Sequence, residues 1–381
     1  MCERVPGGSD GGSSTTGGNR SEDLAVARVK PMFPRPSLVR PPILKPGDKV
    51  AILSPSWAGP GVFPHVQDLG LKRLREHLQL EPVEYPTTRK IGATPQERAA
   101  DIHAAFADPE ITAIMASIGG SDQITVLRYL DPAVLQANPK VFFGYSDNTN
   151  LLVYLWNLGI IGFYGGSTMV HLARPGRLHP TTMESMRRAL FESGEVQLSP
   201  VAEMTDENPS WEDPAALEVE MPMRPGPGWI WAGEQRSVTG PTWGGCLEIL
   251  DMHLRAGTYL LAPEAYAGSV LLLETSEEMP GSEYVYRMLM GMGERGMLEQ
   301  FAAVAVATPK AWDREVGQSF AERTRFAQDQ RAAILRALDE YNPGVPAVFG
   351  LDFGHTDPQI VIPHGGSMTV DGRIRTVTVT Y

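Results

Sequence analysis

The chain has 381 residues, of which 42% are hydrophobic and 20% charged, a composition typical of a globular protein large enough for two domains. Its net charge of −12, without a cluster of Lys and Arg among aromatic residues, argues against nucleic acid and anionic membrane as partners. Cys2 and Cys246 are the only cysteines, so neither a structural disulfide nor a cysteine metal site is expected. Without a signal pattern or an apolar run near the ~20 residues that span a bilayer, a cytoplasmic protein is expected.

The first half of the chain divides into a tail and an α/β domain. Residues 1–40 are rich in Gly, Ser and Pro with little to bury, and they are predicted to form a disordered tail. In residues 41–185, predicted strands at 50–53, 111–118 and 141–143 alternate with predicted helices at 66–77, 95–106 and 124–129. This alternation indicates a parallel sheet covered on both faces, with ligands bound beyond the carboxyl ends of its strands.

The second half begins with a stretch of different character. Residues 186–243 are rich in Pro, Gly and Glu and contain Trp211, Trp229, Trp231 and Trp243, so we interpret them as a linker or lid. Residues 244–381 are predicted to form a C-terminal α/β domain with a β-rich core. Its strands are expected at 269–274, 301–307 and 345–349, and its helices at 283–292 and 320–341.

The segment Gly144-Tyr-Ser-Asp147 joins a buried strand to a helical pattern. A serine on such a turn projects its hydroxyl from the sheet edge, where free N–H groups of the helix can stabilise an oxyanion. The Gly119-Gly120 loop would lie at the same edge. Local sequence alone favours the alternative in which Ser146 is a helix cap and nothing more, because capping serines far outnumber nucleophiles.

A nucleophilic serine needs a base and a group that orients the base. His355 lies between an apolar strand and a Pro-containing loop, a position typical of a site edge and equally of a solvated loop histidine. Glu274 ends the apolar strand 270–274, where an unpaired carboxylate would be costly to bury. Glu277 and Glu278 compete for the acid role, but they are expected in a solvated loop.

Short motifs along residues 44–380 together resemble the LD-carboxypeptidase (muramoyltetrapeptide carboxypeptidase) family of serine peptidases. In chain order they are Lys45-Pro-Gly-Asp48, Ile118-Gly-Gly120, Gly144-Tyr-Ser-Asp147, Gly244-Gly245, Leu272-Leu-Glu274 and Phe353-Gly-His355.

The resemblance implies a fold and a set of catalytic roles. The fold is a flavodoxin- or amidotransferase-like N-terminal domain with a nucleophile elbow. Ser146 would be the nucleophile, His355 the general base and Glu274 the orienting acid, and the oxyanion hole would be the backbone N–H groups of Gly120 and Asp147. It further implies a homodimer without cofactor or metal. The α/β-hydrolases share the order Ser, acid, His, but their Gly-x-Ser-x-Gly motif is absent because Asn148 takes its last position.

Within the family, further segments are similar to the microcin-immunity branch, whose members hydrolyse the amide joining an aminoacyl group to a nucleotide-like toxin. They are Asn138-Pro-Lys140, Phe163-Tyr-Gly165 and Gly228-Trp-Ile-Trp231. The predicted substrate-binding residues are Ser121, Tyr164, Trp211, Trp229, Trp231, Gly244 and Gly245. A tryptophan on a lid can stack on a nucleobase, worth about 1–3 kcal/mol, although each could equally pack the loop onto the domain.

The sequence departs from the family pattern at two places, and two other functions remain as alternatives to this hypothesis. Ser121-Asp122 follows the Gly-Gly pair, and His364 stands in a predicted exposed turn where the family tends to have a small residue. His364 is therefore the competing base. The alternative substrate is a murein tetrapeptide, cut before its terminal D-alanine. The alternative of another class is a catalytically silent protein that binds a peptide or a nucleotide.

Overall fold

The computed structural model describes residues 35–208 and 210–381. Most of the predicted tail lies outside these residues, but its last six residues lie within them and are anchored. Val39 bridges Ile160, with Val39 N donating to Gly159 O at 2.8 Å. Arg35 Nε donates to Ala265 O at 3.1 Å. The end of the predicted tail is therefore held on the folded body by backbone hydrogen bonds of Val39 and by the side chain of Arg35.

The N-terminal sheet has the order β14-β5-β4-β3-β1-β2 within the described residues, and β1 to β5 are parallel. The strands are β1 (Lys49–Leu53), β2 (Glu81–Glu84), β3 (Ile111–Ala116), β4 (Val141–Gly144), β5 (Gly162–Tyr164) and β14 (Ile362–His364). The apolar runs of β1, β3 and β4 are almost wholly buried, as expected when helices cover both faces of a parallel sheet. The predicted parallel α/β sheet is confirmed.

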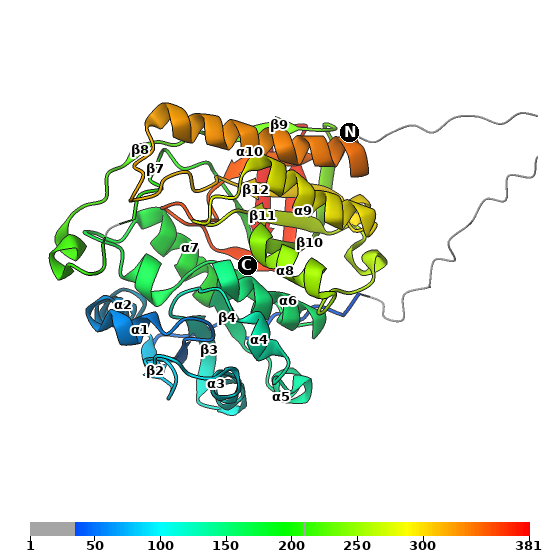
Figure 1. Ribbon diagram of the computed structural model, residues 1–381. Coiled ribbons are helices and arrows are strands. Elements are labelled where there is room, and N and C mark those ends of the chain that lie inside the picture. Colours follow the sequence, from blue (N-terminus) through cyan, green and yellow to red (C-terminus); the bar gives the residue numbers. More distant parts are fainter. Residues whose placement is uncertain (1–34, 209) are drawn as a thin grey trace, which may run out of the picture. The chain divides into compact units, whose positions relative to one another are not determined.

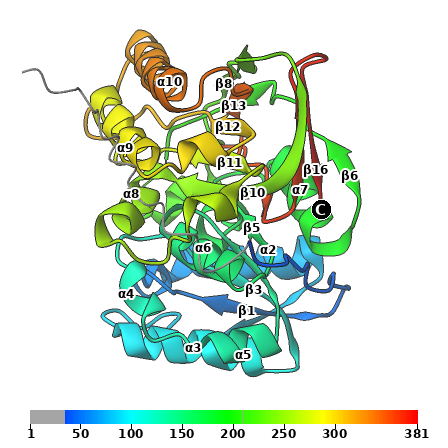
Figure 2. The same ribbon diagram turned by 90° about the vertical axis from the view of Figure 1, so that its right-hand side faces the viewer.

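Helices cover this sheet on both faces (Figures 1 and 2). They are α1 (Gly59–Val62), α2 (Pro64–Leu78), α3 (Pro95–Ala107), α4 (Ile124–Leu127), α5 (Pro132–Ala137), α6 (Thr149–Asn157) and α7 (Pro180–Phe191). Figure 2 shows α3 and α5 beneath β1 and β3, and α6 on the other side, toward β10. The start of α3 is fixed by a capping box in which Thr94 and Glu97 satisfy each other's backbone N–H groups. The apolar face of α6 is buried between the two sheets of the molecule.

The second sheet has the order β6-β16-β15-β10-β11-β12-β13-β9 among the described residues. Its strands are β6 (Glu195–Gln197), β9 (Ile230–Ala232), β10 (Ser237–Cys246), β11 (Val270–Glu274), β12 (Ala303–Ala307), β13 (Ala347–Leu351), β15 (Ser367–Asp371) and β16 (Thr376–Thr380). The central strands β10 to β13 are parallel, and the outer pairings are antiparallel. Helices α8 (Leu247–Ala256), α9 (Ser282–Glu294) and α10 (Phe320–Tyr341) accompany this sheet (Figure 1).

Shorter elements connect the sheets. They are the strand pair β7 (Glu203–Met204) and β8 (Arg224–Pro225), the 3₁₀ helices η1 (Ser146–Asn148), η3 (Pro214–Glu218), η4 (Pro263–Tyr266) and η5 (Leu298–Gln300), and the π-helix η2 (Thr168–Leu172).

Strand exchange blurs the predicted domain boundaries. The segment expected to be a linker, 186–243, contributes β6, β9 and most of β10 to the second sheet. The expected boundary between residues 243 and 244 falls inside β10, and β14 returns from the C-terminal region to pair antiparallel with β5. One edge strand of the N-terminal sheet therefore comes from the C-terminal region, and the predicted linker supplies strands of the second sheet. Local patterns reveal neither pairing.

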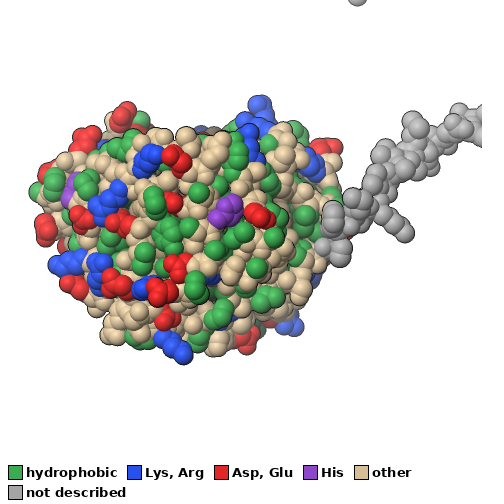
Figure 3. All heavy atoms as spheres, turned by 90° about the horizontal axis from the view of Figure 1, so that it is seen from below, with side chains coloured by type: hydrophobic (Ala, Val, Ile, Leu, Met, Phe, Trp, Pro, Cys, Tyr) green, Lys and Arg blue, Asp and Glu red, His purple; other side chains and the backbone are tan. Residues whose placement is uncertain are grey.

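The surface carries charges of both signs. In the view from below (Figure 3), acidic and basic side chains are interspersed without a broad patch of either sign. No helix of the described chain is long and apolar enough to cross a membrane.

Candidate active site

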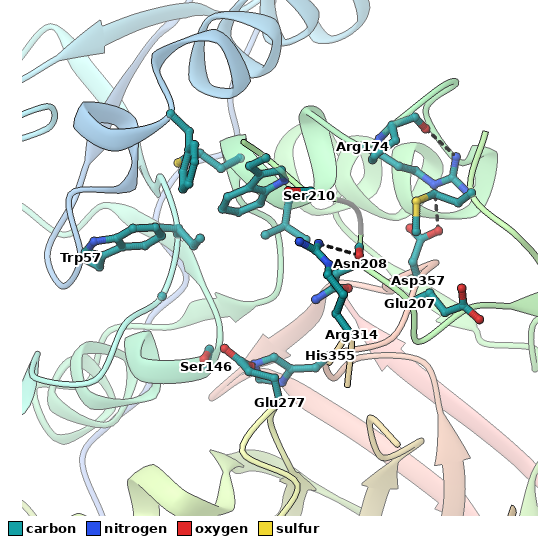
Figure 4. A pocket seen from close by; sticks show the side chains of 18 of the residues that line it. Trp57, Ser146, Arg174, Glu207, Asn208, Ser210, Glu277, Arg314, His355 and Asp357 are labelled. Atoms are coloured by element: carbon teal, nitrogen blue, oxygen red, sulfur yellow. Dashed lines mark hydrogen bonds and ion pairs between the residues drawn. The ribbon is translucent and has the colours of Figure 1, made fainter. Parts of the chain in front are cut away.

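Ser146 and His355, singled out from the sequence, both line one cavity of about 460 Å³. Gly119, Gly120 and Tyr145 line it beside them, and Figure 4 shows Ser146 and Glu277 pointing toward the His355 ring. Ser146 and the Gly119-Gly120 loop follow β4 and β3, so the cavity opens at the carboxyl ends of these parallel strands, as predicted.

Ser146 sits on a sharp turn between β4 and the helices η1 and α6. Tyr145 is extended, and Ser146 has φ +60°, a left-handed conformation that costs a non-glycine residue about 1–2 kcal/mol. A Cβ on Gly119 would lie 3.0 Å from Ser146 Oγ, so a side chain there would crowd the hydroxyl, and glycine permits the close approach of this loop. The N-cap of α6 is Asn148, so the alternative in which Ser146 merely caps the helix is wrong.

Glu274 and His355 form a tight pair next to this turn. His355 Nδ1 lies 2.6 Å from Glu274 Oε2, and the Glu274 side chain is completely buried at the end of β11. A Cβ on Gly354 would lie 3.1 Å from Glu274, so glycine before the histidine permits the close approach. The sequence correctly predicted that the buried carboxylate at this strand end has a partner.

Tyr164 connects the acid to the serine turn. Its hydroxyl donates to Glu274 Oε1 at 2.5 Å and accepts from Ser146 N at 3.3 Å. Both oxygens of the buried Glu274 carboxylate are therefore occupied, which fixes its orientation. Tyr164 is completely buried, so it supports the site from below and does not line the cavity, where it was expected to bind substrate.

The environment of His355 holds it in its charged form. Burial alone would lower its pKa, but Glu274 and Glu277 together raise the pKa of His355 to about 9. Tyr145 packs against the imidazole with ring centroids 4.9 Å apart. His355 Nε2 lies 3.1 Å from Glu277 Oε2, and among the described residues no hydrogen bond joins Nε2 to Ser146 Oγ.

Glu277 is a site residue that the sequence analysis ranked below Glu274. It was a competitor for the acid role, expected in a solvated loop, and its carboxylate lines the cavity and contacts His355. Its side chain is 61% exposed, in keeping with the expected loop. A carboxylate three residues after a candidate catalytic acid was the available signal, but spacing alone could not show that the loop folds back.

Three loops meet at the predicted oxyanion hole. The buried Asp147 carboxylate accepts from Ser56 Oγ at 2.5 Å and from Gln123 N at 2.9 Å. Burial raises the pKa of Asp147, while these hydrogen bonds act in the opposite direction. A Cβ on Gly120 would lie 2.0 Å from Ser56 Oγ, so only glycine fits there. These contacts lock the Gly120 loop against the Ser146 turn, where the N–H groups of Gly120 and Asp147 are the candidate oxyanion donors.

Several predicted substrate-binding residues do not line the cavity. Gly244 and Gly245 are buried in β10 against Leu272 and Tyr164, and the exposed Ser121 also lies outside the lining. Trp229 and Trp231 flank Ile230 at the edge strand β9 of the second sheet, with their rings 6.3 Å apart. The structure therefore does not bring these residues to the cavity, because sequence proximity to a motif does not determine which face of a strand meets it.

Trp211 does line the cavity, together with Trp57 and Phe63. Its ring packs edge-on against Phe63 with centroids 5.7 Å apart. The loop that carries it is anchored just upstream, where Asp206 pairs with Arg323 at 2.9 Å and with Arg224 at 3.2 Å. The ion pair with Arg323 therefore attaches this loop to α10, and the pair with Arg224 joins it to β8.

His364, the competing base, is far from an exposed turn. It is completely buried on β14, where its Nε2 lies 3.2 Å from Gly244 O. Burial lowers the pKa of His364 to about 4, which keeps the ring neutral. The expectation of an exposed turn was wrong because the Pro-His-Gly-Gly segment pairs with β5.

Metal chemistry was not predicted from the sequence. Within residues 35–208 and 210–381, no group of three or more His, Cys, Asp or Glu side chains is arranged to hold a metal ion.

Comparisons with known proteins agree with this geometry. The N-terminal domain of the LD-carboxypeptidase family matches residues 50–165, and its C-terminal domain matches residues 239–370. The chain is 24% identical to the microcin C7 self-immunity protein MccF of Escherichia coli, over 75% of this chain and 79% of the relative. It is also 24% identical to a probable murein peptide carboxypeptidase of Bacillus subtilis, over 89% and 94%.

A solved structure shares the fold. The crystal structure of an MccF-like protein from Streptococcus pneumoniae in complex with AMP superposes with a TM-score of 0.77 at 26% identity, covering 88% of this chain and 99% of that one. The two matched domains together span most of the chain, and their order and the elbow they contain agree with the motifs. The chain belongs to the LD-carboxypeptidase family.

Proposed function

We propose that this carboxypeptidase hydrolyses an amide bond through an acyl-enzyme on Ser146, with His355 as general base and Glu274 as orienting acid. The observation that carries the proposal is the 2.6 Å pair of His355 Nδ1 and Glu274 Oε2 in the same cavity as a serine on a left-handed strand-to-helix turn.

The proposed reaction has two halves. Ser146 Oγ attacks the substrate carbonyl carbon while its proton passes to His355 Nε2, and the backbone N–H groups of Gly120 and Asp147 stabilise the oxyanion. Collapse of the tetrahedral intermediate breaks the C–N bond, and His355 gives the proton to the leaving amine. Water then attacks the ester with His355 again as base, which releases the acid product and restores the Ser146 hydroxyl.

Glu274 and Tyr164 would keep His355 ready for these transfers. An Nδ1–H that donates to Glu274 places the lone pair of neutral imidazole on Nε2, on the side of the cavity. Tyr164 holds the second carboxylate oxygen, so Glu274 cannot rotate away from the ring.

We propose an aminoacyl nucleotide as the substrate. Trp57, Phe63 and Trp211 form a run of edge-on aromatic contacts, with centroids 6.2 Å and 5.7 Å apart, on the wall of the cavity. Flat aromatic side chains at a polar cavity suit a nucleobase. The MccF relative and the AMP complex of the S. pneumoniae protein support the same substrate class.

A murein tetrapeptide is the second candidate substrate. The B. subtilis relative named as a murein peptide carboxypeptidase supports it, and the cavity wall carries charged side chains of both signs that suit a zwitterionic peptide. A catalytically silent binder is disfavoured by the intact pairing of Glu274 with His355 beside the serine turn.

The decisive experiment compares turnover of an aminoacyl-sulfamoyl adenosine and a murein tetrapeptide by the purified full chain. Ser146→Ala should lower kcat by about 10⁴–10⁶-fold on whichever substrate is cut. Ser121→Ala, an exposed serine outside the cavity, is the matched control and should stay within about twofold of wild type. Turnover by Ser146→Ala within about tenfold of wild type would show that the nucleophile is another group, and no turnover by wild type would favour the silent binder.

A further inference from the structure

Glu277 holds a fixed position at the mouth of the site although its side chain is exposed. The loop that carries it is fastened by the preceding residue, because Ser276 N and Ser276 Oγ each donate to Glu248 Oε1 at 2.8 Å. Glu248 and Ser276 are buried, so the loop base is rigid while the Glu277 carboxylate reaches into the cavity. Its Oε2 atom ends 3.1 Å from His355 Nε2.

This contact cannot coexist with the catalytic state of His355. The contact has the distance of an ion pair, and Glu274 and Glu277 together raise the pKa of His355 to about 9. With one carboxylate at Nδ1 and the other at Nε2, this arrangement favours the imidazolium form of the ring. An imidazolium has no lone pair with which to take the Ser146 proton. Glu277 must therefore part from Nε2 before the reaction begins.

Once His355 is neutral, the Glu277 carboxylate has lost its cationic partner and is free to bind another positive charge. Of the cationic groups around the cavity, Arg174 pairs with Asp357 at 2.8 Å and Arg314 donates to Asn208 O at 2.8 Å. Lys310 attracts Glu277, but it is buried and its ammonium donates to Asp206 O. The cations of the described chain near this carboxylate are thus committed to other partners.

We propose that Glu277 binds an ammonium group on the acyl residue of the substrate and that this exchange of partners frees His355 Nε2 to accept the Ser146 proton. The inference rests on the proposed amide hydrolysis. It adds that the substrate residue on the acyl side of the cleaved bond carries a positive charge. When the ammonium binds, Nε2 releases its proton to solvent, so the carboxylate keeps one positive partner throughout. Binding should therefore be accompanied by proton release at neutral pH.

The groups that face His355 agree with this account. Glu274 from β11, Glu277 from the following loop and Glu248 from α8 all raise its pKa. His171 from η2 stays neutral, since burial and His355 lower its pKa to about 3. Because the raised pKa depends partly on Glu277, removing that charge should let His355 lose its proton at lower pH.

An ammonium on the acyl residue can have two sources. It is the α-amine in an aminoacyl nucleotide, and a side-chain amine in a murein peptide that contains a diamino acid. Two pairs of ligands, each with and without the free amine, distinguish these two sources of the ammonium. One is aspartyl-sulfamoyl adenosine and its α-N-acetyl derivative, and the other is the murein tetrapeptide and its side-chain N-acetyl derivative.

The experiment measures binding by calorimetry in the Ser146→Ala background, where turnover cannot interfere. Adding Glu277→Gln should raise the Kd of the amine-bearing ligand by about 10- to 100-fold and the Kd of its acetylated derivative by less than about threefold. Adding Glu278→Gln, the exposed neighbour outside the cavity lining, should change neither ligand. Titrations in buffers of different ionisation enthalpy should show proton release when Glu277 is intact and none after Glu277→Gln.

A second readout uses enzyme with Ser146 intact. The acidic limb of the pH profile of kcat/KM, which reports the free enzyme, should move to lower pH in Glu277→Gln. A purely structural role of the loop would not produce that shift.

The outcomes separate this inference from the proposed function. Equal weakening of amine-bearing and acetylated ligands, or no weakening of either, would overturn the ammonium site even if wild type turns over both substrates. Selective weakening of the amine-bearing ligand supports it, and does so even if wild type turns over neither substrate, in which case only the proposed hydrolysis fails.

Discussion

Deleting the hydroxyl of Tyr164 tests whether catalysis depends on the hydrogen bond that this hydroxyl donates to Glu274. In Tyr164→Phe, Glu274 Oε1 loses the donor at 2.5 Å that occupies it, and the carboxylate remains fully buried. A hydrogen bond to a charged group contributes about 1.5–3 kcal/mol, so the variant should lose about 10- to 150-fold in kcat. The second contact, from Ser146 N at 3.3 Å, is longer and should add little.

The assay is steady-state kinetics on the substrate that the wild type cuts, with thermal unfolding measured in parallel. KM should stay within about twofold, because Tyr164 is buried outside the cavity lining. Tyr154→Phe is the matched control: Tyr154 lies on α6, its hydroxyl donates to Leu130 O at 3.3 Å, and loss of that hydroxyl should leave kcat unchanged. A rise in KM at constant kcat would indicate that Tyr164 binds substrate after all. A kcat within about twofold of wild type would show that catalysis does not depend on the Tyr164 hydrogen bond to Glu274.

Three further changes distinguish the remaining alternatives. His355→Ala should lower kcat by at least about 10³-fold, whereas His364→Ala, which removes a buried neutral ring on β14, should mainly lower the melting temperature; the reverse order in kcat would exchange the two roles. Deleting residues 1–34 should leave the melting temperature unchanged, whereas deleting residues 1–40 should lower it by several degrees through loss of the Val39 bridge to Ile160. Trp211→Ala should raise KM for an aminoacyl-sulfamoyl adenosine by about 10- to 100-fold and for murein tetrapeptide far less, and equal effects would make Trp211 a packing residue.

Local patterns were sufficient for the elements that carry the catalytic groups. The strands β3, β4 and β11 are where the sequence predicted them, because each is a buried apolar run bounded by turn residues. The helix α10 is also where it was predicted. The polar residue that follows such a strand must lie at the sheet edge. That rule placed Ser146 and Glu274 before any contact was known.

Local patterns failed where one strand pairs with a segment from the other sequence region. β14 and β6 are short and could not be told from loops, so His364 was expected in an exposed turn and residues 186–243 in a linker. Strand pairing over such separations depends on which edges remain open after the sheets form, and that is a property of the folded chain.

The sequence by itself determined the parallel α/β sheet and the serine turn, and it singled out Glu274 at the end of β11 and His355 after β13, which the structure brings together. Each of these depends on the periodicity of hydrophobic residues, on turn-forming residues or on motif spacing, and all three can be read from the local sequence. Only the tertiary structure decided that Tyr164 supports Glu274 from below, that Trp229 and Trp231 lie away from the cavity, and that Glu277 reaches His355. Those contacts join residues far apart in sequence or depend on how a loop folds back, and no local energy term fixes either.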